Sequence, residues 1–434
     1  MYNKKMILYS VSIVLMMDYM GYGMLLSIAP QLFMNSESGL FMNSSMSTLW
    51  REILFSISLS LFSLMSVVGM PILCSLSDQY GRKKVLLFNI CGFIINYLIG
   101  ALAVLLHSFE LFLFNRMCDG FLDGIYPLVD TIIGDISENE EERVSSFKLL
   151  GITSTTGMVL GPLLAIIVYK VDLTNPVVLA FLCSALLGAF GLCFSIYGLR
   201  GMPPHRPIIL HNHSFLHRFN IFNGLRYLFS RIHVKFISVA YFLFQFGSGL
   251  VFQGLGLYLT IKYDYTSLEL GKFMLIMCVI TIIGMNLLPK LFSRVLGYKT
   301  QMIALLLFTS GLLLVEFWVK NFVALVAYRQ WVVTAYAVWV VAGIFYAIQP
   351  SINSIFNSFL SSTVSYPRRG MVLGGFGQIF SLAWGLSALT VGIMIEYKLV
   401  LLFAGILFGC CCFLMLCHFQ LHSRRRLNKK QPAT

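Results

Sequence analysis

Between two long apolar segments, the chain carries the short polar stretch SLSDQYGRKKV at residues 75–85. Its Asp78 ends one helix, Gly81 supplies a tight turn, and three cations at residues 82–84 open the next helix. The apolar segments on both sides have the length of membrane spans, so the stretch is a loop at the membrane surface. Cationic loops stay on the cytoplasmic side of a membrane, and we therefore expect this loop to be cytoplasmic.

The composition predicts a chain that lies mostly in lipid. Of its 434 residues, 58% are hydrophobic and only 11% are charged, whereas soluble domains are about 45–50% apolar and about 25% charged. The net charge of +13 does not indicate nucleic-acid binding, because no soluble basic domain exists to hold it. The ten cysteines lie in or beside apolar segments without zinc-ligand spacing, so we interpret them as buried hydrophobic residues.

Apolar segments of about 20 residues, long enough to cross a membrane, recur along the whole chain. We predict twelve spans, at residues 6–33, 52–74, 85–106, 110–134, 147–169, 176–199, 234–260, 269–290, 300–319, 329–357, 370–395 and 399–420. An even number of spans places both termini on one side. Lys and Arg concentrate in the connections on the side of the opening loop, so both termini and the central connection are predicted to be cytoplasmic.

The longest interruption, rich in Pro and Arg, falls between the sixth and seventh spans and divides the chain into two sets of six. We therefore predict an all-α polytopic membrane protein with twelve transmembrane helices in two six-helix bundles. The expected parts are an N-terminal bundle (1–199), a basic linker (200–233), a C-terminal bundle (234–420) and a basic tail (421–434). Histidines in the linker lack a carboxylate or Cys to complete a ligand set, and we predict no metal site.

Ionisable groups inside membrane spans are costly, so each is a candidate for function. Asp18 lies in the middle of the first span. The fourth span carries Arg116, Asp119, Asp123 and Asp130, whose spacing predicts one face of a helix. This face lines a transport cavity or forms a buried structural network, in which Arg116 pairs with Asp119. Asp18 is likewise either a proton or substrate site or a structural partner for a neighbouring helix.

In the second half, amide side chains take the place of charges. Gln245 and Gln253 lie in the seventh span, and Gln349 and Asn353 share one face of the tenth. They either contact a substrate or bridge helices.

Two further patterns concern how helices move. An acidic stretch follows the fourth span, and we expect its Asp135 to pair with Arg82 as a cytoplasmic latch. In the fifth span, Gly157, Gly161 and Pro162 predict a small-residue packing face with a kink. The chain has no GxxxxGK[ST] loop and no nucleophile–base set, so we expect no enzyme and no cofactor.

Several of these patterns resemble those of the major facilitator superfamily. Residues 77–83 resemble its motif in the loop between the second and third helices, with Cys74 at a position usually held by Gly. Arg116 with Gly120 and Gly124 resembles its fourth-helix pattern. Residues 157–162 resemble the fifth-helix motif associated with antiporters, with Leu-Ala in place of its closing Gly-Gly.

Residues 17–30, 134–136 and 142–143 look most like the tetracycline/proton antiporter branch of that superfamily. The resemblance implies two pseudo-symmetric bundles that give alternating access to a central cavity. It also implies a gating role for residues at the cytoplasmic side: Asp78, Gly81, Arg82, Lys83, Asp135 and Arg143. The corresponding second-half stretch, 293–299, lacks the Asp, so gating is expected to be asymmetric.

Together these patterns predict a secondary active transporter in the cytoplasmic (inner) membrane of a bacterium. We expect it to move a small amphipathic molecule, coupled to protons, with efflux favoured. Proton-coupled uptake of a nutrient, such as an amino acid or an iron chelate, remains an alternative, and a non-transporting receptor or scaffold a remote one. The expected partners are the substrate, protons and the lipid bilayer, with no nucleic acid, and the chain is expected to be a monomer.

Overall fold

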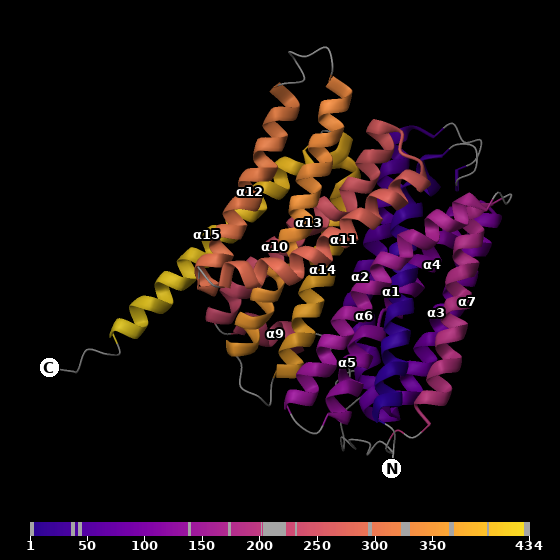
Figure 1. Cartoon of the computed structure of the whole chain (residues 1–434), viewed down its shortest axis with the longest axis horizontal. Helices are drawn as coiled ribbons and strands as arrows, with labels where there is room; N and C mark the ends of the chain where they lie inside the picture. The colour runs from indigo at the N-terminus through magenta and orange to yellow at the C-terminus, as the bar shows by residue number, and fades with distance from the viewer. Residues whose placement is uncertain are drawn as a thin grey trace. The chain divides into compact units, whose positions relative to one another are not determined.

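In the computed structural model, the described residues are 4–35, 40–41, 46–137, 140–171, 175–200, 202, 223–230, 232–293, 297–322, 330–363, 369–396 and 399–428. Every regular element in these ranges is an α-helix (Figure 1). The helices are α1 (Lys4–Met34), α2 (Thr48–Tyr80), α3 (Arg82–Leu105), α4 (Phe109–Phe121), α5 (Ile125–Ile136), α6 (Glu140–Lys170), α7 (Pro176–Gly198), α9 (Asn223–Ser230), α10 (Ile232–Tyr263), α11 (Ser267–Ser293), α12 (Tyr298–Phe322), α13 (Gln330–Thr363), α14 (Arg369–Glu396) and α15 (Val400–Asn428).

The predicted class, an all-α polytopic membrane fold, is confirmed. Among the described residues, eleven helices are long and apolar enough to cross a membrane. They match eleven of the twelve predicted spans, and the remaining span, the fourth, is built differently.

The fourth span consists of two half-helices, so the prediction of one unbroken helix over 110–134 was wrong. Helix α4 ends at Phe121, and α5 begins at Ile125 after a non-helical connection. Pro127 has no N–H to donate to the carbonyl of Asp123, which weakens a continuous helix at this point. Asp130 therefore lies on a different half-helix from Arg116 and Asp119, and the predicted common face of the four charges is interrupted.

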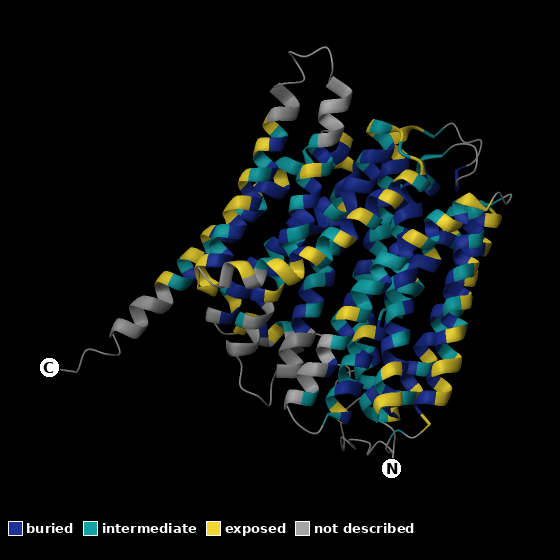
Figure 2. Ribbon diagram, in the orientation of Figure 1, coloured by how far each residue is buried: buried dark blue, intermediate teal, exposed yellow. Residues whose placement is uncertain are grey.

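Helix α3 shows why the surrounding solvent is lipid. Beyond its first turn, its exposed side chains are large and apolar and include Phe88, Ile95 and Leu102, each seven residues from the next and thus on one face. Exposed residues are yellow in Figure 2. Its buried side chains include the amides Asn89 and Asn96, which are 0% and 2% exposed. Apolar groups outside and polar groups inside are the arrangement expected of a helix in a bilayer.

The chain forms two compact units. Unit 1 comprises residues 1–221 and 256–278, and unit 2 comprises residues 222–255 and 279–434. Unit 1 thus holds α1 to α7 together with the connected ends of α10 and α11. These ends attach to it through the Gln31 side chain, which donates to the Tyr265 carbonyl, and the Cys278 thiol, which donates to the Met158 carbonyl. The predicted division of the chain at a central linker remains a prediction.

Within unit 1, α1 and α6 approach each other backbone to backbone. A Cβ at Gly157 would lie 2.2 Å from the Met16 carbonyl oxygen, and one at Gly161 would lie 2.5 Å from that of Met20. The ring of Pro162 fills the space beside Gly23. The three residues expected to form a packing face thus lie where the two helix backbones meet.

Candidate functional site

A cluster of buried charges lies in unit 1, around the junction of α4 and α5. The Arg116 side chain is only 3% exposed, and its Nη2 lies 2.8 Å from Asp119 Oδ2. The guanidinium also lies 5.8 Å from the ring centre of Phe62 and 5.6 Å from that of Phe112. Aromatic faces attract a cation, and the carboxylate neutralises it, so a charge that is costly in this place is well compensated.

Amides from α3 and α4 extend this pair into a network. Asn96 donates from Nδ2 to Asp119 Oδ1 at 2.9 Å, and its own backbone carbonyl accepts from Asn115 Nδ2 at 2.6 Å. Asn115 Oδ1 in turn accepts two bonds from Arg116, both at 3.3 Å. Asp119 is therefore held from two directions, by a cation one turn earlier on its own helix and by an amide from α3.

The other two carboxylates are held less firmly. Asp123 accepts one hydrogen bond, from Ser66 Oγ of α2, at 2.5 Å. Asp18 of α1 is half-buried and makes no hydrogen bond or ion pair with any residue that the structure describes, although it lies within electrostatic range of Asp119 and Asp123. Of the three carboxylates, only Asp119 is thus paired with a guanidinium. Such a site holds excess negative charge unless protons or a cation bind, which is the chemistry of a proton-accepting site.

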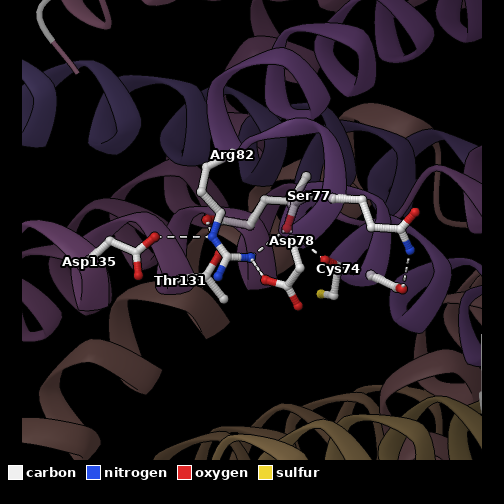
Figure 3. Close-up of polar contacts among 9 residues, drawn as sticks. Cys74, Ser77, Asp78, Arg82, Thr131 and Asp135 are labelled. Carbon is white, nitrogen blue, oxygen red and sulfur yellow. Dashed lines mark hydrogen bonds and ion pairs between the residues drawn. The ribbon is translucent and has the colours of Figure 1, made fainter. Parts of the chain in front are cut away.

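Four of the predicted gating residues, Asp78, Gly81, Arg82 and Asp135, lie together at one end of unit 1, which we call the gate end (Figure 3). Gly81, with a φ of 98°, makes the turn between α2 and α3. Arg82 then forms an ion pair with Asp78, donates to Ser77 Oγ at 2.6 Å and donates from Nε to Asp135 Oδ2 at 3.1 Å. One guanidinium therefore links the last turn of α2 and the last turn of α5 to the first residue of α3.

Two other predicted gating residues do not join this arrangement. Lys83 is half-buried and forms no ion pair within the described part of the chain. The side chain of Arg143 lies outside the described residues. Asp130, predicted for the cavity, lies on α5 between the charged cluster and the gate end.

In unit 2, the predicted amides form a neutral network between helices. Gln245 of α10 donates to Asn353 Oδ1 of α13 at 2.9 Å and accepts from the Trp384 indole of α14 at 3.3 Å. Gln253, two turns further along α10, donates to the Trp384 carbonyl and the Ser387 hydroxyl, both at 3.1 Å. Gln349 is half-buried and makes no hydrogen bond with the described residues.

Aromatic rings surround this network. The Phe252 ring centre lies 4.2 Å from that of Tyr346 and 5.6 Å from that of Trp384, and Phe380 stacks on Trp384 at 5.0 Å. Such rings offer a large apolar contact area together with amide hydrogen bonds, which suits an amphipathic ligand.

Sequence reasoning missed Ser66, Asn96 and Asn115, whose hydrogen bonds support the charged cluster. Serine and asparagine are neutral and common in these helices, so the sequence offers no clear signal for their roles. No group of His, Cys, Asp or Glu side chains in the described ranges could hold a metal ion.

Comparisons with known proteins agree with these features. A family model described as Major Facilitator Superfamily matches residues 11–388. The class H tetracycline resistance protein of Pasteurella multocida is 26% identical over 192 residues, which is 44% of each chain, so the alignment spans less than half of that relative.

Solved structures match over nearly the whole chain. The crystal structure of the human organic anion transporter MFSD10 gives a TM-score of 0.65 at 18% identity, covering 97% of this chain and 100% of that one. The crystal structure of a D-xylose–proton symporter gives 0.72 at 14% identity, covering 94% and 97%. At these identities the likeness concerns the fold.

Proposed function

The chain belongs to the major facilitator superfamily of secondary transporters, and on this premise we propose that it couples proton movement to the transport of a small amphipathic molecule. The observation that carries the proposal is the cluster of Asp18, Asp119 and Asp123 around a single Arg116. A structural network would pair each carboxylate with a donor, whereas two of these three are left with one hydrogen bond or none. Ionisable side chains are costly to bury inside a membrane span, so those found there mark an ion or proton pathway.

We assign the roles as follows. Arg116 and Asp119 form the fixed part of the site, because their pair is completed by amides from two helices. Asp123 and Asp18 are the proton carriers, since protonating either breaks no ion pair. The amide–aromatic network of unit 2 supplies substrate contacts, with Gln245, Gln253, Gln349 and Asn353 as hydrogen-bonding groups.

We further propose that the ion pairs of Arg82 stabilise the state closed at the cytoplasmic side. The Lys and Arg distribution supports an orientation with the gate end and both termini in the cytoplasm. The relatives with tetracycline resistance in their names are bacterial, which supports a bacterial inner membrane and efflux as the direction. We propose that the transporter works as a monomer.

The experiment is transport in proteoliposomes of the purified protein under an imposed pH gradient. A panel of amphipathic compounds, with tetracycline as the first probe, is screened for movement that dissipates the gradient. Asp123→Asn is expected to abolish proton-driven movement while substrate exchange between equal pools persists, because exchange needs no net proton transfer.

The matched control is Asp264→Asn, the same change at an exposed residue in the connection between α10 and α11. It should leave proton-driven transport unchanged. If Asp123→Asn retains full pH-driven transport, the assignment of Asp123 as a proton carrier is overturned. If wild-type vesicles neither transport nor exchange any compound of the panel, a receptor or scaffold is favoured.

A further inference from the structure

The junction between α4 and α5 contains a polar side chain that forms no hydrogen bond with any described residue. Asn89 of α3 is 0% exposed, and neither its Nδ2 nor its Oδ1 has a hydrogen-bond partner. Leaving buried donors and acceptors unpaired costs about 1–3 kcal/mol for each group. A native structure rarely carries two such groups in one side chain unless a bound water or ion supplies the partners.

Asn89 points at the break in the fourth span. A Cβ on Gly124 would lie 2.5 Å from Leu73 Cδ1 and 3.0 Å from Asn89 Nδ2, so the absence of a side chain lets the amide lie directly beside Gly124. Gly124 is the N-cap of α5 and carries no side-chain cap, and the first N–H groups of the helix, those of Ile125 and Tyr126, have no intrahelical acceptor. Unsatisfied donors of the backbone and an unsatisfied amide therefore meet at one place.

The chemistry of these groups selects the ligand. Asn89 leaves open both a donor and an acceptor, and the α5 terminus adds donors. A monovalent cation would satisfy only the amide oxygen, and an anion would satisfy only the donors and be repelled by the neighbouring carboxylates. A water molecule accepts and donates at once, and a buried water needs two to four such partners, which this junction provides.

We propose that Asn89 and the first turn of α5 hold an internal water molecule at this break, and that this water passes protons to and from Asp123. The inference rests on the proposed proton coupling. Asp123 immediately precedes Gly124 in the non-helical connection, so it is the carboxylate residue of the same break. In each transfer the water gives one proton to a carboxylate oxygen and takes another from the solvent side, so it is regenerated.

The position of Asn89 gives the pathway its direction. Asn89 lies seven residues after Arg82, the first residue of α3, which is about 10 Å along the helix axis. It therefore lies at the break, about 10 Å from the gate end along α3. The titratable and charged groups near this path, from every helix around it, are Asp18, Tyr19 and Tyr22 on α1, Cys74 and Asp78 on α2, Arg82 and Tyr97 on α3, Arg116 and Asp119 on α4, and Tyr126 and Asp130 on α5.

The test is the rate of proton uptake by the purified protein after a rapid drop in pH, followed with an indicator dye in stopped flow. It needs no substrate. Asn89→Leu keeps the branching and the number of side-chain heavy atoms but has neither donor nor acceptor. It should slow the uptake phase that Asp123→Asn removes by at least about tenfold, without reducing its extent. Asn89→Ser, which keeps a donor and an acceptor, should restore a rate near that of the wild type.

Two controls make the outcome decisive. Asn286→Leu, the same change at an exposed amide of α11, should leave the rate unchanged. A high-resolution structure should show a water peak within hydrogen-bond distance of Asn89 and the start of α5. A dry break, or a wild-type rate in Asn89→Leu, would overturn the water relay. If Asp123→Asn removes no proton-uptake phase at all, the proton-carrier role in the proposed function fails instead.

Discussion

The charged cluster of unit 1 and the amide–aromatic network of unit 2 differ in charge: the first contains carboxylates and a guanidinium, and the second only neutral groups. Both place polar groups in helices that a membrane surrounds. In unit 1, Asp119 pairs with Arg116, Asp123 accepts only from Ser66, and Asp18 forms no hydrogen bond or ion pair with the described residues. In unit 2, Gln245, Asn353 and Trp384 are neutral and satisfy one another.

The difference indicates a division of labour. A neutral network has the same charge at every pH, so it can contact a solute but cannot carry a proton. An under-neutralised carboxylate cluster changes charge when a proton binds, and the energy of that change depends on which groups surround it. We therefore assign coupling to unit 1 and solute contact to unit 2.

The largest effect is expected from removing the cation of unit 1. Arg116→Met leaves Asp119 buried without its ion pair, and breaking a buried pair in this way costs about 3–5 kcal/mol of the free energy of unfolding. The measurement is unfolding in mixed detergent micelles, followed by tryptophan fluorescence and circular dichroism. The double variant Arg116→Met with Asp119→Asn should recover a large part of the loss, since it leaves no unpaired charge. No recovery would show that Arg116 acts mainly through its contacts with Phe62 and Phe112.

The next largest effect concerns the backbone contact that positions the cluster. A Cβ at Gly120 would lie 2.0 Å from the Phe62 carbonyl oxygen, so Gly120→Ala must push α2 and α4 apart at a cost of about 3 kcal/mol. Unit 2 offers the matched change, because a Cβ at Gly377 of α14 meets nothing within 4 Å. Gly377→Ala should unfold at the wild-type temperature, and equal losses in the two variants would contradict the role of close packing.

A moderate effect is expected in the neutral network. Gln245→Leu removes the acceptor of the Trp384 indole and the donor to Asn353, and leaving these groups unpaired costs about 2 kcal/mol. Because no charge is involved, the loss of stability should be the same at pH 5 and pH 8. A loss that changes with pH would show that a titratable group takes part in unit 2 and would weaken the division between the units.

The sequence predicted the helices well, because about twenty consecutive apolar residues have one low-energy form in a bilayer. It did not predict the break in the fourth span. Gly120, Gly124 and Pro127 are visible in the sequence, but glycine and proline also occur inside unbroken membrane helices. The structure adds that α2 packs directly against the last turn of α4, with the Phe62 carbonyl beside Gly120.

Within the site, the charged residues could be predicted and their partners could not. An aspartate in a membrane span is conspicuous because burying its charge is costly, whereas a neutral hydroxyl or amide such as Ser66 or Asn96 has no evident signal. Pairing within one helix follows from spacing, as for Arg116 and Asp119. Pairing between helices, such as Gln245 with Asn353, depends on packing that no local pattern contains.

The smallest effect is expected at the gate end, where both carboxylates are about half exposed and solvent screens the pairs. Arg82 reaches Asp78 and Asp135 at once because its fork offers several donors, and a lysine presents a single ammonium that serves one of them. Arg82→Lys should therefore lower unfolding free energy by less than about 1 kcal/mol. Since 1.4 kcal/mol corresponds to a tenfold change in an equilibrium, the substitution should shift the balance of closed and open states by about two- to fivefold.

Labelling of a cysteine placed near the gate end measures this balance. Lys83→Arg is the control, because Lys83 forms no ion pair among the described residues. An unchanged labelling rate in Arg82→Lys would reduce the arginine to a residue of the turn, and the charge asymmetry between the units would then concern proton binding alone.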